Sequence, residues 1–233
     1  MWSIVAVAER FNRRKHILFF PDIFCFRMKA FFRNTDNASD ILALRRESSD
    51  IFVINYHKTL CFNLISGIPS AVRAAREVSL YTRSPVLLHG RLDIEGDAFL
   101  STMVMKKGEI IGVGDCITNE GFTAGNALRM YELCGKKIGL AVDCDVFESG
   151  TDNFFYAGCG AVFHNTLSRF DKSYFASYKS HMRLSKGKYV GLFGDCVVEA
   201  DKRLRILPAD GEAEIVVGEI GPLKSFLKIS QEF

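Results

Sequence analysis

The sequence predicts one α/β domain over residues 1–233, built on a mixed β-sheet that helices cover. Short apolar runs of strand length alternate with amphipathic stretches of helix length, and glycine-containing turns join several neighbouring strands. This alternation is typical of α/β folds, and the hairpins add antiparallel pairs to the sheet. The 48% hydrophobic and 24% charged residues are the proportions of a globular protein, and no internal repeat or linker divides the chain.

The first half of the chain contains two predicted helices and four predicted strands. One helix is expected from Asp36 to about residue 47. The next begins at Pro69, where the missing N–H costs nothing, and Val72, Ala75 and Val78 form its inward stripe. The expected strands are 51–54, 85–88, 99–105 and 109–113, with a turn at Gly108 between the last two. Residues 1–35 are atypical: 1–8 have the composition of a strand, whereas 11–33 show no clear period.

The second half is predicted to be richer in strands. A hairpin of 128–133 and 138–142 turns at Cys134-Gly135. Further strands are expected at 161–163, 189–199 and 213–220, and helices at 151–157 and 173–184. Because helices alternate with both parallel crossovers and hairpins, a mixed sheet is favoured over a purely parallel one.

Charge and cysteine usage narrow the classes of partner and compartment. A net charge of +3 indicates no specific partner, and a nucleic-acid-binding face would require denser basic patches with interleaved aromatic residues. The apolar runs are shorter than the roughly 18–20 residues that span a bilayer, and no secretory leader is evident. The seven cysteines include no Cys-x-x-Cys pair. The expectation is a cytoplasmic protein with reduced cysteines that binds neither membrane nor nucleic acid.

The segment 135–147 is the most informative part of the chain. An apolar strand, Ile138 to Val142, leads out of a glycine turn and stops abruptly at Asp143-Cys144-Asp145. Open α/β folds place their chemistry at the carboxyl ends of strands. A functional site is therefore predicted at this turn.

Six motifs, in order over residues 36–220, resemble the nitrilase (carbon–nitrogen hydrolase) superfamily, as does the 135–147 segment itself. They are the strand 49–56, the strand ending in glycine at 84–90, the hairpin 103–112, the loop Glu120-Gly121-Phe122-Thr123-Ala124-Gly125-Asn126, the turn Ala157-Gly158-Cys159-Gly160-Ala161 and the strand 191–198. The resemblance implies a four-layer α-β-β-α sandwich that assembles as a dimer or a higher oligomer. It also implies chemistry on carbon–nitrogen bonds, in which a cysteine thiolate attacks, a glutamate is the general base and a lysine stabilises the oxyanion.

Carried over residue by residue, the resemblance places other residues at all three catalytic positions. The glutamate position falls on Tyr56, the lysine position on Asp115 or Cys116, and the nucleophile position on Asp143. Glu120 matches a second glutamate that helps order the site in the family, and Asp145 matches an aspartate two residues past the nucleophile.

Three chemical alternatives remain open at this turn. Cys144 is a candidate nucleophile, although side chains alternate along a strand and a one-residue shift would turn its thiol to the opposite face. Asp143 is a second candidate, acting as a carboxylate nucleophile. A divalent cation is the third, with oxygen ligands from Asp115, Glu120, Asp143 and Asp145.

The remaining candidates are interpreted as structural. His57 and His164 are expected to be packed imidazoles, and Lys58 to be solvated. The favoured hypothesis is a nitrilase-superfamily domain without the usual thiol chemistry, acting as a binding, regulatory or structural subunit and forming a dimer. A small-molecule ligand is a candidate partner, and no cofactor or metal is expected. The rival hypothesis is an active amidohydrolase with Cys144 or Asp143 as nucleophile and Glu120 as base.

Overall fold

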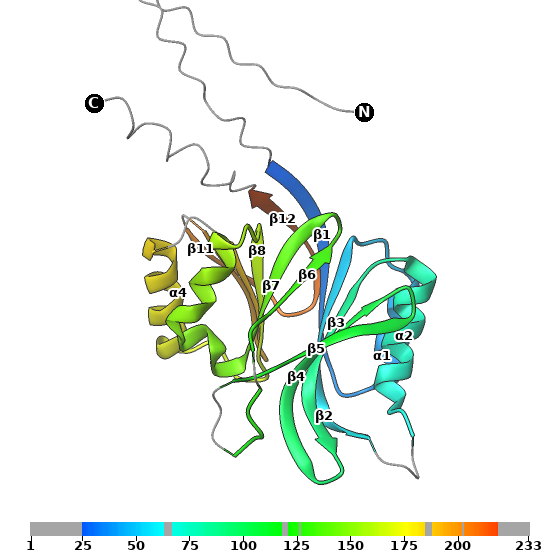
Figure 1. Ribbon diagram of the computed structural model, residues 1–233. Helices are drawn as coiled ribbons and strands as arrows, with labels where there is room; N and C mark the ends of the chain where they lie inside the picture. Colours follow the sequence, from blue (N-terminus) through cyan, green and yellow to red (C-terminus); the bar gives the residue numbers. More distant parts are fainter. Residues whose placement is uncertain are drawn as a thin grey trace, which may run out of the picture.

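Two six-stranded β-sheets pack face to face at the centre of the molecule (Figure 1). The computed structural model describes residues 25–62, 67–117, 121–125, 127–184, 188–201 and 203–218. Within these ranges, the strand order is β12-β1-β2-β3-β4-β5 in the first sheet and β11-β10-β9-β8-β7-β6 in the second. Each sheet mixes parallel and antiparallel pairs, as the sequence predicts.

The first sheet is built mainly from the N-terminal half of the chain. It contains β1 (Cys25–Thr35), β2 (Ile51–Phe62), β3 (Val86–Ile94), β4 (Asp97–Lys106), β5 (Glu109–Asp115) and, from the C-terminal part, β12 (Gly211–Gly218). Strands β1, β2 and β3 are parallel, while β4, β5 and β12 join in antiparallel pairs. Two helices accompany this sheet: α1 (Ala38–Ala43), extended by the 3₁₀ turn Leu44–Arg46, and α2 (Ser70–Thr82).

The second sheet carries the segment on which the functional prediction rests. Its strands are β6 (Arg129–Leu133), β7 (Lys136–Val142), β8 (Ala161–Asn165), β9 (Lys188–Leu192), β10 (Cys196–Ala200) and β11 (Leu204–Pro208). Strands β7, β8 and β9 are parallel, and the others are antiparallel. The 3₁₀ helices Asp143–Phe147 and Ser149–Asp152, the short α3 (Asn153–Tyr156) and α4 (Lys172–Leu184) accompany this sheet.

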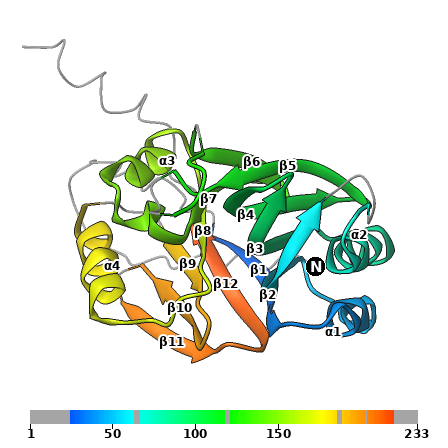
Figure 2. The same cartoon turned by 90° about the horizontal axis from the view of Figure 1, so that it is seen from below.

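Three apolar interfaces define four layers, which Figure 2 shows from below. One lies between α1, α2 and the first sheet and includes Ile41, Val78 and Phe52. Another fills the space between the two sheets, and the third packs α3 and α4 against the second sheet. The central strands of each sheet are thus buried on both faces, which explains why strands such as β3, β8 and β9 read as continuous apolar runs. The four-layer α-β-β-α sandwich is confirmed.

Helix α2 and the predicted hairpins form for the reasons that the sequence suggests. Pro69 precedes α2, and the stripe of Val72, Ala75 and Val78 is completely buried. In the turns of β4–β5 and β6–β7, Gly108 and Gly135 have φ of 80° and 72°, a left-handed conformation that glycine adopts readily. The residue before each glycine also has a positive φ, as two-residue hairpin turns of this kind require.

Several predicted boundaries are wrong. Residues 189–199 form a hairpin, β9 and β10, and not one strand, while β1 and β11 were not predicted. The helix expected at 151–157 is a 3₁₀ turn followed by the four residues of α3. The strand expected at 1–8 lies outside the described residues. No helix in the described part of the chain has the length and apolar character needed to cross a membrane.

Candidate functional site

Asp143 occupies a sharp turn at the carboxyl end of β7. Its φ of 48° lies in the left-handed region, which aspartate tolerates better than most residues. The carboxylate of Asp145 holds this turn, because it accepts hydrogen bonds from the backbone N–H groups of Val142 (3.1 Å) and Ile117 (2.8 Å). Asp145 therefore ties the end of β7 to the segment that follows β5.

The side chain of Asp143 points into the protein and is only 7% exposed. Its Oδ1 accepts a 2.5 Å hydrogen bond from the hydroxyl of Thr166, which directly follows β8. The thiol of Cys144 lies 3.5 Å from Oδ2. A buried carboxylate is stable only when such donors replace its water. These contacts fix the carboxylate as part of a hydrogen-bonded network.

His164, on β8, supports the same turn from the face that α4 covers. Its Nε2 lies 2.7 Å from the backbone carbonyl of Asp143, which can only accept, so this nitrogen carries the proton. Its Nδ1 then accepts from the hydroxyl of Tyr178, at 2.9 Å. Burial lowers the pKa of His164 from 6.5 to about 4, consistent with a neutral ring. With both ring nitrogens bonded to protein groups, His164 is a structural imidazole.

Cys144 lies next to Asp143 but is poorly suited to nucleophilic attack. Its thiol is partly exposed, and burial raises its pKa from 9.0 to about 11, with the negative charges of Asp143 and Asp145 acting in the same direction. Since the thiolate is the nucleophilic form of cysteine, this raised pKa makes the thiol a poor nucleophile at neutral pH. Reactive cysteines occupy electropositive surroundings, and these surroundings are electronegative.

The residues predicted for the other two catalytic positions lie in different settings. The buried side chain of Tyr56 packs among the apolar residues between the first sheet and α1 and α2. Its neighbour Asn55 faces the second sheet instead. Asp115, at the end of β5, accepts a 2.5 Å hydrogen bond from the hydroxyl of Ser101. The alternative for that position, Cys116, is buried with its sulfur 3.5 Å from Asp145.

The structure thus brings together Asp143, Cys144, Asp145 and Cys116 at one turn, while Glu120 lies outside the described residues. Thr166 was not predicted, although it follows the buried strand 161–165, as a site residue would. Among the described ranges, no group of three or more histidine, cysteine or acidic side chains could hold a metal ion.

His57 and Lys58 are exposed residues of β2 that contact groups other than those of this turn. The expectation of a packed imidazole is wrong for His57, whose ring is exposed and lies 3.2 Å from the side-chain oxygen of Asn34. Lys58 makes an exposed ion pair with Asp36 at 3.6 Å. An exposed pair of this kind contributes little to stability and leaves the lysine solvated.

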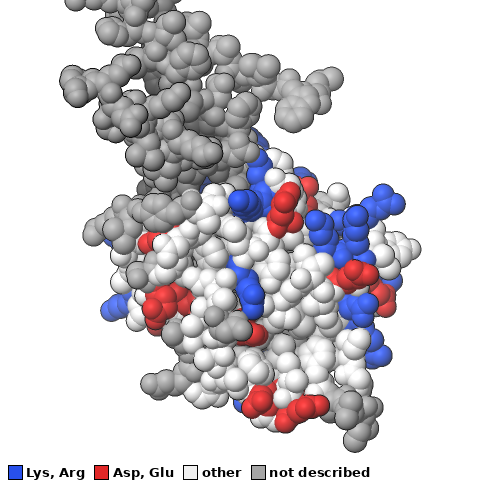
Figure 3. All heavy atoms as spheres, viewed as in Figure 1, with Lys and Arg blue, Asp and Glu red and all other residues white. Residues whose placement is uncertain are grey.

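A cavity of about 270 Å³ lies elsewhere in the molecule. Its lining comes from β1, β10, β11, β12 and the turn before β12, and includes Phe32, Glu199, Arg205, Leu207, Asp210 and Ala213. No lining residue belongs to the network around Asp143. On the face shown in Figure 3, basic side chains gather at the side where α2 lies, and the centre is largely uncharged.

Comparisons with known proteins identify the architecture. The sequence matches neither a family model nor a curated protein. Among solved structures, Saccharomyces cerevisiae Nit3, a member of the nitrilase superfamily, is similar with a TM-score of 0.62 and 10% identity, over 88% of this chain and 95% of that chain. A nitrilase-superfamily amidase from Nesterenkonia is similar with a TM-score of 0.60 and 11% identity, over 88% and 94%.

Two further solved structures share this architecture. A mutant of the Nesterenkonia amidase carries the acetamide moiety of fluoroacetamide on its active-site cysteine. The glutamine-dependent NAD⁺ synthetase from Acinetobacter baumannii is similar with a TM-score of 0.55 and 13% identity, over 82% of this chain but only 45% of that chain. At these identities the likeness concerns the fold. The two sheets and their helices have the four-layer fold of the nitrilase superfamily.

Proposed function

We propose that this protein keeps the nitrilase-superfamily fold without its thiol-dependent amidase or nitrilase chemistry, and acts as a binding, regulatory or structural subunit of a homo-oligomer. The observation that carries the proposal is the turn after β7. At the position where the resemblance places a nucleophilic cysteine, it presents a buried carboxylate, that of Asp143, held by Thr166. A carboxylate oxygen that accepts a short hydrogen bond is a weaker nucleophile than an unbonded one.

The neighbouring groups support the same proposal. The imidazole of His164 is bonded at both nitrogens, so it has no site left to take a proton from a nucleophile. The thiol of Cys144 is held in its protonated form by burial and by Asp143. Acyl transfer needs an activated nucleophile beside a base and an oxyanion donor. This turn instead supplies bonds that fix its own conformation.

An assay of ammonia release from a panel of small amides and nitriles tests the proposal. We expect no release above the buffer rate from the wild-type chain or from the variants Cys144→Ala and Asp143→Asn. The matched control is Cys61→Ala, which removes an exposed thiol on β2. Turnover by the wild type that is lost in either site variant and kept in the control would establish the rival amidohydrolase. Light scattering on the same sample tests assembly, since a monomer would contradict the oligomeric part of the proposal.

A further inference from the structure

The inner face of the first sheet changes from apolar to polar between two adjacent rows of residues. One row across β2, β3 and β4 consists of Val53, Leu87 and Val104, which lie in the apolar core between the sheets. The neighbouring row, two residues away on each strand, consists of Asn55, His89 and Thr102, which are also register partners. Because side chains alternate along a strand, these three polar groups point into the same space between the sheets.

The second sheet meets this row with polar groups of its own. The side-chain amide of Asn55 donates to the backbone carbonyls of Thr166 (2.8 Å) and Leu192 (3.2 Å). From the end of β8, the amide of Asn165 lies 3.5 Å from the hydroxyl of Thr102, which is also 3.2 Å from Nδ1 of His89. The row is therefore one connected junction between the two sheets.

Among the residues that the structure describes, three side-chain atoms of this junction are buried without a hydrogen-bond partner: Oδ1 of Asn55, Nε2 of His89 and Oδ1 of Asn165. All three residues are at most 1% exposed. The amide of Asn55 cannot be reversed, because its nitrogen faces two carbonyls that only accept, so its oxygen is a true acceptor. A polar atom left unsatisfied in the interior is costly, so three of them on the connected side chains of this junction point to an additional binding partner.

We propose that one internal water molecule binds between the sheets and bridges His89, Asn55 and Asn165. A water molecule has two protons to donate to the two amide oxygens and a lone pair to accept a proton from Nε2 of His89. Buried waters usually make about three hydrogen bonds, the number offered at this junction.

This water has a consequence for the turn at Asp143. Asn165 precedes Thr166, whose hydroxyl holds the Asp143 carboxylate and whose carbonyl accepts from Asn55. The bridge thus fixes the end of β8 against β2 and β3 directly beside the residue that positions Asp143. The water is a structural ligand of the fold, and the inference holds whether or not the turn is catalytic.

The test is a water–protein cross-relaxation experiment on the full chain with isotope-labelled histidine. We expect a cross-peak between water and the ring protons of His89. Its sign should be that of a water contact whose lifetime exceeds the rotational correlation time of the protein. His164 is the internal control, since it is equally buried but has protein partners at both ring nitrogens. Absence of a long-lived contact at His89 under these conditions would overturn the inference.

A crystal structure at high resolution is an independent test for the bound water molecule. Ordered density is expected within hydrogen-bond distance of Nε2 of His89 and of at least one of the two amide oxygens. A direct hydrogen bond from His89 to Asn55 or Asn165, with no density between them, would contradict the proposal. The variant Asn165→Leu removes one acceptor and should weaken the water contact at His89 by NMR, whereas an unchanged contact would exclude Asn165 from the bridge.

Discussion

Asp143 combines a left-handed backbone with a buried carboxylate, and each requirement limits which residue can stand there. Aspartate and asparagine enter the left-handed region more readily than most residues, because a short polar side chain can bond locally. The carboxylate then needs the hydroxyl of Thr166, at 2.5 Å, to replace water. The identity of this residue is therefore coupled to Thr166 across the second sheet.

Replacing Thr166 with valine should destabilise the protein, since it leaves the Asp143 carboxylate buried without this donor. The expected loss is on the order of 1.5–3 kcal/mol in the free energy of unfolding, the range for hydrogen bonds to charged groups. Urea unfolding of Thr166→Val is to be compared with Thr166→Ser, which keeps the hydroxyl. Equal stability of the two variants would show that the hydroxyl is not needed by Asp143.

Two buried histidines make stability depend on pH. Burial lowers the pKa of both His89 and His164 from 6.5 to about 4. Between these values, the unfolded chain binds protons that the folded chain does not, so the free energy of unfolding falls as the pH falls from 6.5 to 4. The effect for both rings together is on the order of a few kcal/mol. Burial raises the pKa of Asp145, which opposes this loss at the acidic end.

Urea midpoints measured between pH 7.5 and pH 4.5 test this dependence. The midpoint should be constant above about pH 7 and then decrease steadily as the pH falls. Histidine ring signals should show His89 and His164 still neutral at pH 5. A midpoint that does not change across this range would contradict neutral, buried imidazoles.

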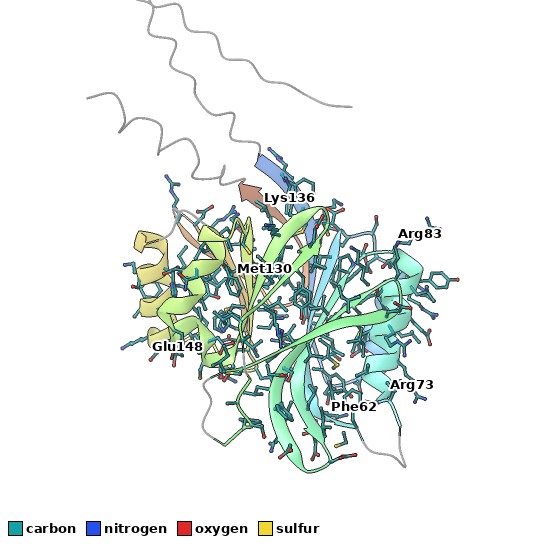
Figure 4. The ribbon with its side chains drawn as sticks, in the orientation of Figure 1. Phe62, Arg73, Arg83, Met130, Lys136 and Glu148 are labelled. Carbon is teal, nitrogen blue, oxygen red and sulfur yellow. The ribbon has the colours of Figure 1, made fainter. Side chains whose placement is uncertain are left out.

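At the scale of elements, helix α2 ends at a residue, Arg83, that does not suit the backbone conformation of its position. Arg83 caps the helix with a φ of 61°, in the left-handed conformation where glycine is usual. Arg73 lies within the same helix, and Figure 4 shows both arginines on the side of the molecule away from the second sheet. A bulky residue at such a cap stores about 1 kcal/mol of strain.

Arg83→Gly should therefore raise the free energy of unfolding by about 0.5–1 kcal/mol. Arg73→Gly is the matched control, because the same change inside the helix should lower it by about 1 kcal/mol. Thermal unfolding of both variants measures the two effects. If both variants were less stable than the wild type, the strain assigned to the cap would be wrong.

A strand could be predicted from the sequence where polar or glycine residues clearly bound an apolar run. Strands β3, β7 and β8 were recognised because compact apolar runs stop at polar or glycine residues. The run 189–199 was predicted as one strand because apolar residues such as Phe193 and Val197 are buried on both sides of Gly194-Asp195, the short polar break that forms the turn. Strand β11 was missed because most of its residues are exposed or partly exposed and it lacks an apolar run.

The candidate site was only partly predictable, because the sequence does not show on which face of a buried strand each side chain lies. The turn at Asp143-Cys144-Asp145 was located because an apolar strand ends there. Residues 51–56 of β2 are all buried, so alternation could not reveal which of Asn55 and Tyr56 faces the second sheet. The junction with His89 and Asn165 depends on contacts between strands far apart in sequence, which no local pattern encodes.

For the molecule as a whole, the four layers maintain the architecture independently of the chemistry at one turn. The apolar interfaces of the sandwich involve residues other than Asp143 and Cys144. A nucleophile can therefore be replaced without removing the packing that defines the fold. Function has to be argued from the site and not from the fold.

The most direct test of this account is reaction with fluoroacetamide, which leaves an acetamide moiety on the active-site cysteine of a mutant of the Nesterenkonia amidase. The full chain is incubated with the reagent at neutral pH and each cysteine is quantified by peptide mass spectrometry. We predict that Cys144, with its raised pKa, reacts no faster than the exposed Cys61. Rapid and selective modification of Cys144 would contradict the account and show that a functional thiol remains.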